Sequence, residues 1–212
     1  MKKLLFLICF ISSFNAWSQN KTVETEAKYF TNWMDKIIHL SVDQKNEMIA
    51  LRTNYILEKN ALKKSKVATT FDRQQLDRDY WKKRDRILTR DQSILLATHL
   101  VTSREVEELN HIVALHKDQK QSFYDTYKIV NYTLMKDKKD YGRYSDKYIK
   151  TDQSAIARKK EIINDLLIAE QKETYDTYFE DLKKRKNNAT FHATEEEDVE
   201  IDGYNILEPI GF

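Results

Sequence analysis

Apolar residues recur along the chain at intervals of three, four and seven, the spacing that places side chains on one face of an α-helix. The clearest stripes are Met48, Leu51, Tyr55 and Leu62; Phe123, Tyr127, Val130 and Leu134; and Ile149, Ile156 and Ile163. No stretch alternates between apolar and polar residues as a half-buried strand does. The pattern predicts an all-α protein made of long amphipathic helical hairpins.

Residues that interrupt helices are rare. Between residues 19 and 202 the chain contains one glycine, Gly142, and no proline, so long helices are expected. The acids Glu105, Glu107 and Glu108 follow Ser103, and acids suit the first turn of a helix because of its dipole. The expected breaks are at Ala68–Thr70, at Asp140–Arg143 and before Ser103, where a new helix should start.

The segment at residues 1–18 is typical of a secretory signal peptide. Two lysines precede the mostly apolar segment Leu4–Phe14, and Ala16-Trp17-Ser18 forms a small-x-small cleavage site. The segment is too short to span a membrane. We therefore expect a periplasmic protein that keeps no thiol, because the single cysteine, Cys9, leaves with the signal peptide.

Charge is unevenly distributed along the remaining chain. Residues 191–212 contain seven acids and neither lysine nor arginine, whereas residues 19–190 carry a net charge of +7. Periodicity stops at Asn187, so residues 187–212 are predicted to form a disordered acidic tail. The basic body favours acidic or unfolded proteins as partners, and nucleic acid is not expected outside the cytoplasm.

A five-residue pattern, Leu-x-x-(Asp/Glu)-Gln, begins at Leu40, Leu88, Leu115 and Leu167. In the first two copies a hydroxyl residue can cap a helix, and a glutamine three residues later can close a capping box. The residues assigned to this helix-capping motif are Leu40, Ser41, Gln44, Leu88, Thr89 and Gln92. His116 and Ile168 replace the hydroxyl residue in the looser copies.

The spacing of the four copies is paired. Intervals of 48 and 52 residues flank one of 27, as a tandem duplication of one helical unit would give. The predicted organisation is a first hairpin unit at residues 19–102 and a second at residues 103–186, between the signal peptide and the acidic tail.

Paired Leu-Thr-x-x-Gln motifs in a small, exported, charge-rich helical protein resemble the Spy and CpxP family of periplasmic chaperones and stress proteins, which is related to periplasmic heavy-metal sensors. The resemblance covers about residues 32–186, with its best motifs at residues 40–44 and 88–92. It implies curved helical cradles whose basic, partly apolar concave face holds unfolded proteins without ATP. Relatives with one motif pair are implied to dimerise, and two pairs in this chain favour a monomer.

The expected function is therefore that of an ATP-independent periplasmic chaperone or envelope-stress adaptor for unfolded or misfolded envelope proteins. The alternative is a periplasmic sensor or regulator module for metal or envelope-stress signalling, which acts through protein–protein contact, for example with a membrane-bound regulator. Tyrosine and tryptophan among basic residues suit transient binding to apolar and backbone groups. The client-binding residues predicted on this basis are Tyr80, Trp81, Lys82, Lys83, Arg84, Tyr132, Lys136, Lys138, Lys139, Tyr141 and Tyr144, whereas Tyr127 and Tyr148 are expected in the core.

Catalytic and cofactor-binding patterns are absent from the sequence. It has no Gly-x-Ser-x-Gly and no glycine-rich phosphate loop, so an enzyme and a bound cofactor are not expected. His111 and His116 are five residues apart, which splays their rings on a helix, whereas Glu107 and His111 are four apart and form at most one ligand pair. No metal site is predicted.

Overall fold

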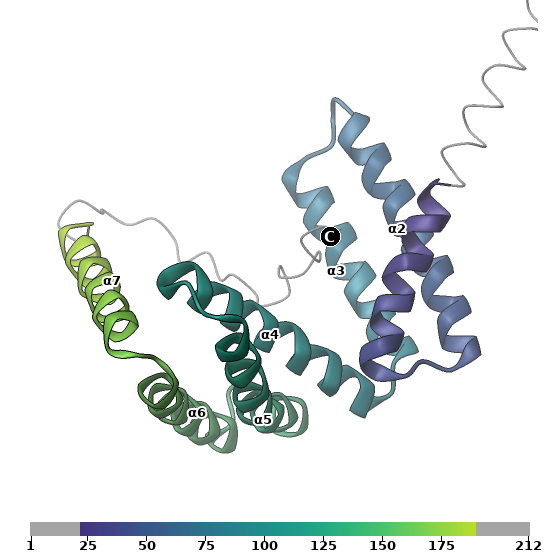
Figure 1. The fold of residues 1–212 in the computed structure, drawn as a ribbon. Helices are drawn as coiled ribbons and strands as arrows, with labels where there is room; N and C mark the ends of the chain where they lie inside the picture. Colours follow the sequence, from purple (N-terminus) through teal and green to yellow (C-terminus); the bar gives the residue numbers. More distant parts are fainter. Residues whose placement is uncertain (1–21, 190–212) are drawn as a thin grey trace, which may run out of the picture. The chain divides into compact units, whose positions relative to one another are not determined.

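The structure, a computed structural model, describes residues 22–189, and it is helical in every element of that range (Figure 1). The prediction of an all-α fold is confirmed. The predicted signal peptide and most of the predicted acidic tail lie outside the described residues. The helices are 22–38, α2 (Val42–Lys64), α3 (Thr70–Ile87), α4 (Arg90–Val113), α5 (Lys117–Tyr141), α6 (Asp146–Leu166) and α7 (Ala169–Ala189).

Two of the three predicted helix breaks are confirmed. Thr69 caps α3 and exchanges hydrogen bonds with Asp72, and Gly142 ends α5 with a positive φ of 80°, a conformation that glycine adopts without steric cost. The predicted start before Ser103 is wrong, because α4 continues through it. Glu105 and Glu107 instead pair with lysines of α6 and α5, so these acids serve contacts between helices rather than a helix start.

The C-terminal end of the helical region also differs from the prediction. Helix α7 continues through Asn187 and Asn188 to Ala189, although apolar periodicity stops at residue 187. Loss of periodicity removes a packed face but not the helical preference of a segment without glycine or proline.

The chain forms two compact units, of which the first extends to Ser93. Within it α2 and α3 lie side by side, joined by a short loop (Figure 1). Tyr55 of α2 stacks on Tyr80 of α3 with ring centroids 4.3 Å apart, and Ile56 and Val23 complete the cluster. Burial of these large rings is a main source of stability for so small a core.

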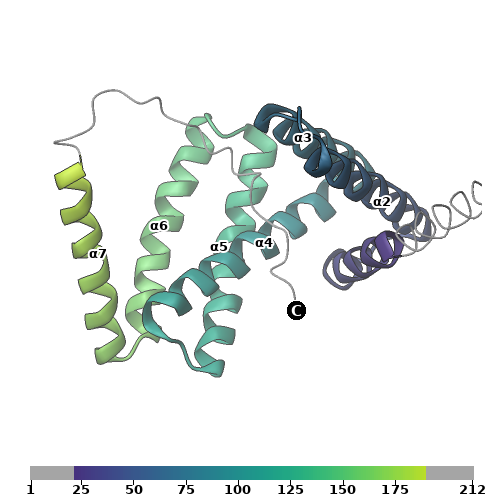
Figure 2. The same ribbon diagram turned by 90° about the horizontal axis from the view of Figure 1, so that it is seen from above.

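The second unit begins at Ile94 and contains most of α4 with α5, α6 and α7. Helices α5 and α6 pack along each other (Figure 2). The unit boundary lies within α4, before the predicted start of the second unit at Ser103. The core of this unit is Val106, Leu109, Val113, Leu115, Phe123, Tyr127, Ile162, Ile163 and Leu167.

Candidate functional site

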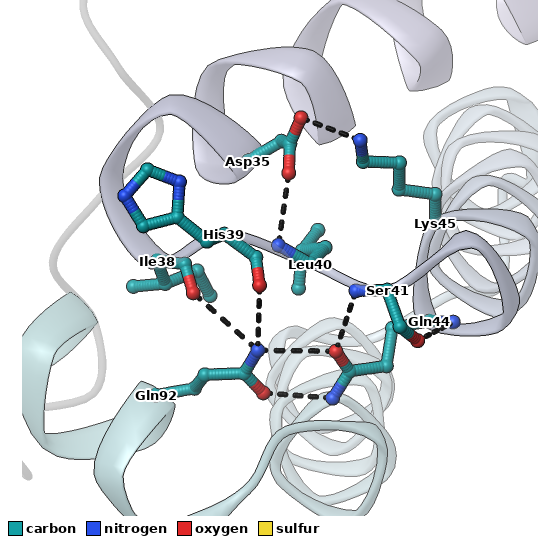
Figure 3. A network of polar contacts seen from close by, with 8 residues as sticks. All are labelled: Asp35, Ile38, His39, Leu40, Ser41, Gln44, Lys45 and Gln92. Carbon is teal, nitrogen blue, oxygen red and sulfur yellow. Dashed lines mark hydrogen bonds and ion pairs between the residues drawn. The ribbon is translucent and has the colours of Figure 1, made fainter.

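The glutamines of the first two motif copies, far apart in sequence, face each other where α2 and α4 begin (Figure 3). Gln44 Nε2 donates to Gln92 Oε1 at 2.7 Å, and Gln92 Nε2 donates to Gln44 Oε1 at 3.0 Å. The two side-chain amides therefore pair reciprocally, each acting as donor and acceptor.

Each amide also holds the end of a preceding helix. Gln44 Nε2 donates to the carbonyl of Ile87, the last residue of α3, at 2.8 Å. Gln92 Nε2 donates to the carbonyl of His39, just after helix 22–38, at 3.1 Å. Since the last carbonyls of a helix lack partners within it, the pair satisfies helix ends as well as joining two helix starts.

The capping boxes predicted at Ser41 and Thr89 are present. The backbone N–H of Gln44 donates to Ser41 Oγ at 3.1 Å, and the backbone N–H of Ser41 donates to the side-chain Oε1 of Gln44 at 3.0 Å. Thr89 and Gln92 make the same exchange at 3.2 and 2.9 Å. Each glutamine is thus both the last residue of a local cap and half of a long-range pair.

The turn that leads into the first motif has a strained conformation. His39 has a φ of 52°, an uncommon left-handed geometry for a residue other than glycine. Asp35 stabilises the turn, because its Oδ1 accepts from the Leu40 amide at 2.8 Å while its Oδ2 lies 2.6 Å from Lys45 Nζ (Figure 3). Lys45, helped by the Leu40 amide, lowers the pKa of the Asp35 carboxyl.

The second motif pair, in the second unit, reproduces this arrangement without the hydroxyl residues. Gln119 and Gln171 exchange hydrogen bonds at 2.9 and 3.1 Å, and Gln119 Nε2 donates to the Leu166 carbonyl at 3.0 Å. The amides of His116 and Ile168 donate to these glutamines at 3.0 and 3.2 Å. Loss of the hydroxyl removes half of the capping box and leaves the glutamine pair intact.

The correspondence extends through the turn. Ala114 has a φ of 48°, and Asn110 Oδ1 accepts from the Leu115 amide at 3.1 Å, as Asp35 does for Leu40. Ala114 therefore corresponds to His39, and the same register aligns α2 with α5.

Two registers relate the repeats along their whole length. The register that aligns Gln44 with Gln119 also aligns the residues of helix 22–38 with those of the second half of α4, and the residues of α2 with those of α5. The register that aligns Gln92 with Gln171 also aligns the residues of α3 with those of α6, and the residues of α4 with those of α7. Helix α4 is therefore the fourth helix of the first repeat and the first helix of the second.

A cation lies beside an aromatic ring at equivalent positions of the two repeats, with the roles of the two helices exchanged. In the first, Arg52 of α2 is buried with its guanidinium 5.6 Å from the ring of Tyr80 of α3. The same registers align these two positions with Tyr127 of α5 and Lys159 of α6, where the ammonium lies 5.5 Å from the ring. A cation and a ring attract each other whichever helix carries which, so the exchange preserves the contact.

The predicted client-binding residues of the first unit are mostly less accessible than expected. Tyr80 is 2% exposed and belongs to the core, so the prediction of Tyr80 as a surface residue is wrong. Trp81 is half-buried and Arg84 lies over its ring at 4.6 Å. Lys82 and Lys83 are exposed. Tyr80 turns inward because stacking on Tyr55 buries more apolar area than a surface position would.

The predicted residues of the second unit are on the surface, at and after the end of α5. Tyr132, Tyr141 and Tyr144 are exposed, Tyr144 by 78%, as are Lys136 and Lys139, whereas Lys138 is half-buried. Tyr127 is buried as predicted, and Tyr148 is half-buried. We call Ile129, Tyr132, Lys136, Lys139, Tyr141 and Tyr144 the α5 surface.

Ile129 belongs to this surface although it was not predicted. It is 73% exposed and lies three residues before Tyr132 and seven before Lys136, so the three side chains share one stripe of α5. The sequence carries a signal for its exposure, because Ile129 lies on the side of α5 opposite to the buried stripe of Phe123 and Tyr127.

One apolar stripe is only partly buried, against the expectation of a packed amphipathic face. Ile163 is in the core, but Ile156 is 51% exposed and Ile149 is also exposed. The contacts of α7 with this core run through Tyr175, near the start of α7, and the stripe loses its cover farther from that contact.

We searched for a metal site and a membrane-spanning helix among the described residues and for relatives of the chain. Within residues 22–189, no three histidine, cysteine, aspartate or glutamate side chains gather as a metal site requires. None of the described helices has the length and apolar character needed to cross a membrane. Comparisons of the chain with protein-family models, curated proteins and solved structures find no match.

Proposed function

We propose that this protein is an ATP-independent periplasmic chaperone or envelope-stress adaptor that binds unfolded proteins through the α5 surface. The observation that carries the proposal is the composition of that surface, which combines exposed tyrosine and isoleucine side chains with lysines. Ile129 and Tyr132 share one stripe of α5, and monomeric proteins seldom expose large neighbouring apolar side chains without a use for them.

The chemistry of the surface fits a weak and rapidly reversible contact. Lysines attract acidic or unfolded chains at long range and accelerate encounter, whereas tyrosine rings offer apolar area with a polar tip. The contact needs no nucleotide and no covalent step. The glutamine pairs support the proposal in a second way, because the motifs that resemble the Spy and CpxP family prove to be in contact with each other.

An aggregation assay tests the proposal. The protein is added to an unrelated unfolding protein, and light scattering is followed at low and high salt. We expect suppression of aggregation that weakens as salt rises, since screening shortens the reach of the lysines. Protein that leaves aggregation unchanged at every salt concentration would contradict the proposal and favour the regulator module that contacts a membrane-bound partner.

A matched pair of variants separates a specific surface from general positive charge. Lys139 of the α5 surface and its half-buried neighbour Lys138 lie in the last turn of α5. In the alignment of the two repeats, Lys138 and Lys139 correspond to Lys63 and Lys64 in the last turn of α2. Both substitutions to glutamate therefore change charge by the same amount at the same place in a helix. Suppression should be lost in the Lys138→Glu/Lys139→Glu variant and kept in the Lys63→Glu/Lys64→Glu variant. Equal loss in both would show that only net charge matters.

A further inference from the structure

Two apolar stripes in the second unit leave the core together and end without cover. On α6 the stripe runs from Ile163, which is buried, back to Ile156 and Ile149, which are exposed. On α7, Tyr175 packs against the same core, and Phe179, one turn later with its ring 4.6 Å away, is exposed. We call Ile149, Ile156 and Phe179 the open α6–α7 face.

The geometry of α6 and α7 explains the open face. A two-residue link joins Leu166 to Ala169 beside the second glutamine pair, and the helices separate from there (Figure 2). The start of α6 and the end of α7 are therefore the ends distant from the pair. On α6 the two isoleucines distant from the pair are exposed, and on α7 Phe179 is exposed whereas Tyr175, nearer to the pair, packs against the core.

The apolar character of the face is not required by the fold. The register that places α3 on α6 aligns Thr70 with Ile149 and Asp77 with Ile156. Thr70 and Asp77 are both polar, and Asp77 accepts a hydrogen bond from the Tyr55 hydroxyl at 2.7 Å. Since one repeat is built with polar residues at these positions, the fold does not require isoleucine there, and the exposed isoleucines of the other repeat offer a surface to an apolar segment.

The chain itself supplies such a segment. Twenty-three residues follow Ala189, and they begin at the end of α7 nearest to the open end of the face. The last fourteen combine acids with the apolar residues Val199, Ile201, Tyr204, Ile206, Leu207, Ile210 and Phe212. Twenty-three extended residues span up to about 75 Å, whereas α6 is about 30 Å long, so the segment reaches all of the face.

Individual lysines beside the apolar stripes complement the acids of the segment. Residues 190–212 carry seven acids and no lysine or arginine. Exposed basic side chains adjoin the apolar stripes on both helices, among them Lys150, Lys160 and Lys183. We propose that residues 199–212 bind in cis to the open α6–α7 face, with their apolar side chains on the isoleucines and their acids beside these lysines. This inference does not depend on the binding of unfolded proteins.

A single introduced thiol tests the proposal. In a Cys9→Ser background, Ile156→Cys places the only thiol of the chain on the face, and its rate of reaction with a maleimide reports exposure. A tethered segment has an effective concentration on the order of 1 mM. With an intrinsic Kd of about 0.1 mM, it would cover the face about ten times out of eleven and slow labelling about tenfold relative to a chain ending at Thr190.

The control is Ile129→Cys in the same two chains. Ile129 is an exposed isoleucine of the same unit that lies on α5, outside the face. Its labelling rate should be the same with and without residues 191–212, and circular dichroism should show equal helix content in all four proteins. Equal rates at position 156 in both chains would overturn the proposal. Slowing at both positions, or slowing that grows with protein concentration, would also overturn it, since these outcomes indicate general shielding or the tail of a second copy.

Discussion

Removal of one glutamine of the first pair should cost more stability than removal of a helix cap. Gln44 makes four hydrogen bonds with its side-chain amide, two to Gln92, one to the Ile87 carbonyl and one from the Ser41 amide. At a net contribution of about 0.5–1.5 kcal/mol for each bond, the loss of all four in Gln44→Ala should lower the free energy of unfolding by roughly 2–6 kcal/mol. A lost cap alone costs about 1 kcal/mol.

The long-range pair can be isolated by a double-mutant cycle. Gln44→Ala and Gln92→Ala each remove the two reciprocal bonds, so the double variant should be less destabilised than the sum of the single variants. The expected coupling energy is about 1–3 kcal/mol. Both substitutions keep a good helix former near a helix start, which limits other effects.

Tryptophan fluorescence during urea denaturation measures the stability of the first unit, which contains the Gln44–Gln92 pair. Trp33 and Trp81 both belong to the first unit, and the chain from Ile94 onward contains no tryptophan. Gln74→Ala, an exposed glutamine of α3, is the matched control and should change stability by less than about 0.5 kcal/mol. Additive effects of Gln44→Ala and Gln92→Ala, with coupling below about 0.3 kcal/mol, would refute the paired geometry.

Substitution or titration of single residues tests other parts of the structure. Thr89→Ala should lower stability by about 1 kcal/mol in thermal denaturation, whereas His116→Thr should leave the melting temperature unchanged or raise it, because threonine supplies the missing cap. Ala114→Gly should raise stability by about 0.5–1 kcal/mol in urea, since glycine adopts the φ of 48° without strain. Burial raises the pKa of Tyr55 to about 12, so this phenol should ionise late in ultraviolet titration, and stability present below pH 10 should be lost as the pH rises toward 12. Burial lowers the pKa of His99, so its imidazole, titrated by NMR, should stay neutral below pH 6.5, and stability present above pH 6.5 should be lost as the pH falls through the lowered pKa.

The sequence predicted much of the local structure, because local structure depends on neighbours in sequence, but not the continuation of α4 through Ser103 or of α7 through Asn187. The helical period, the cap at Ser41 and the stop at Gly142 each involve residues within four positions of one another. The pairing of Gln44 with Gln92 could not be derived in the same way. A capping box already explains each glutamine through a local partner, and nothing in the pattern requires a second partner in a distant helix.

The surface was harder to predict, because periodicity identifies an apolar face without showing what covers it. Tyr80 and Trp81 are neighbours of similar character, and only the position of Tyr55 decides which of them is buried. Ile149 and Ile163 share a stripe, but only Ile163 belongs to the core against which Tyr175 of α7 packs. Exposure of the other end depends on the direction in which a later helix leaves the core.

Helix α4 belongs to both repeats, as the last helix of the first and the first helix of the second, and this affects how such a protein can change in length. Since helix 22–38 and the second half of α4 occupy equivalent positions, a deletion of residues 39–113 would join Ile38 to Ala114 in register and leave one complete repeat. The reverse event, insertion of the same segment, adds a repeat with three new helices and no linker. Recombination between equivalent positions would therefore produce a family of chains that differ by whole repeats, each with its own glutamine pair.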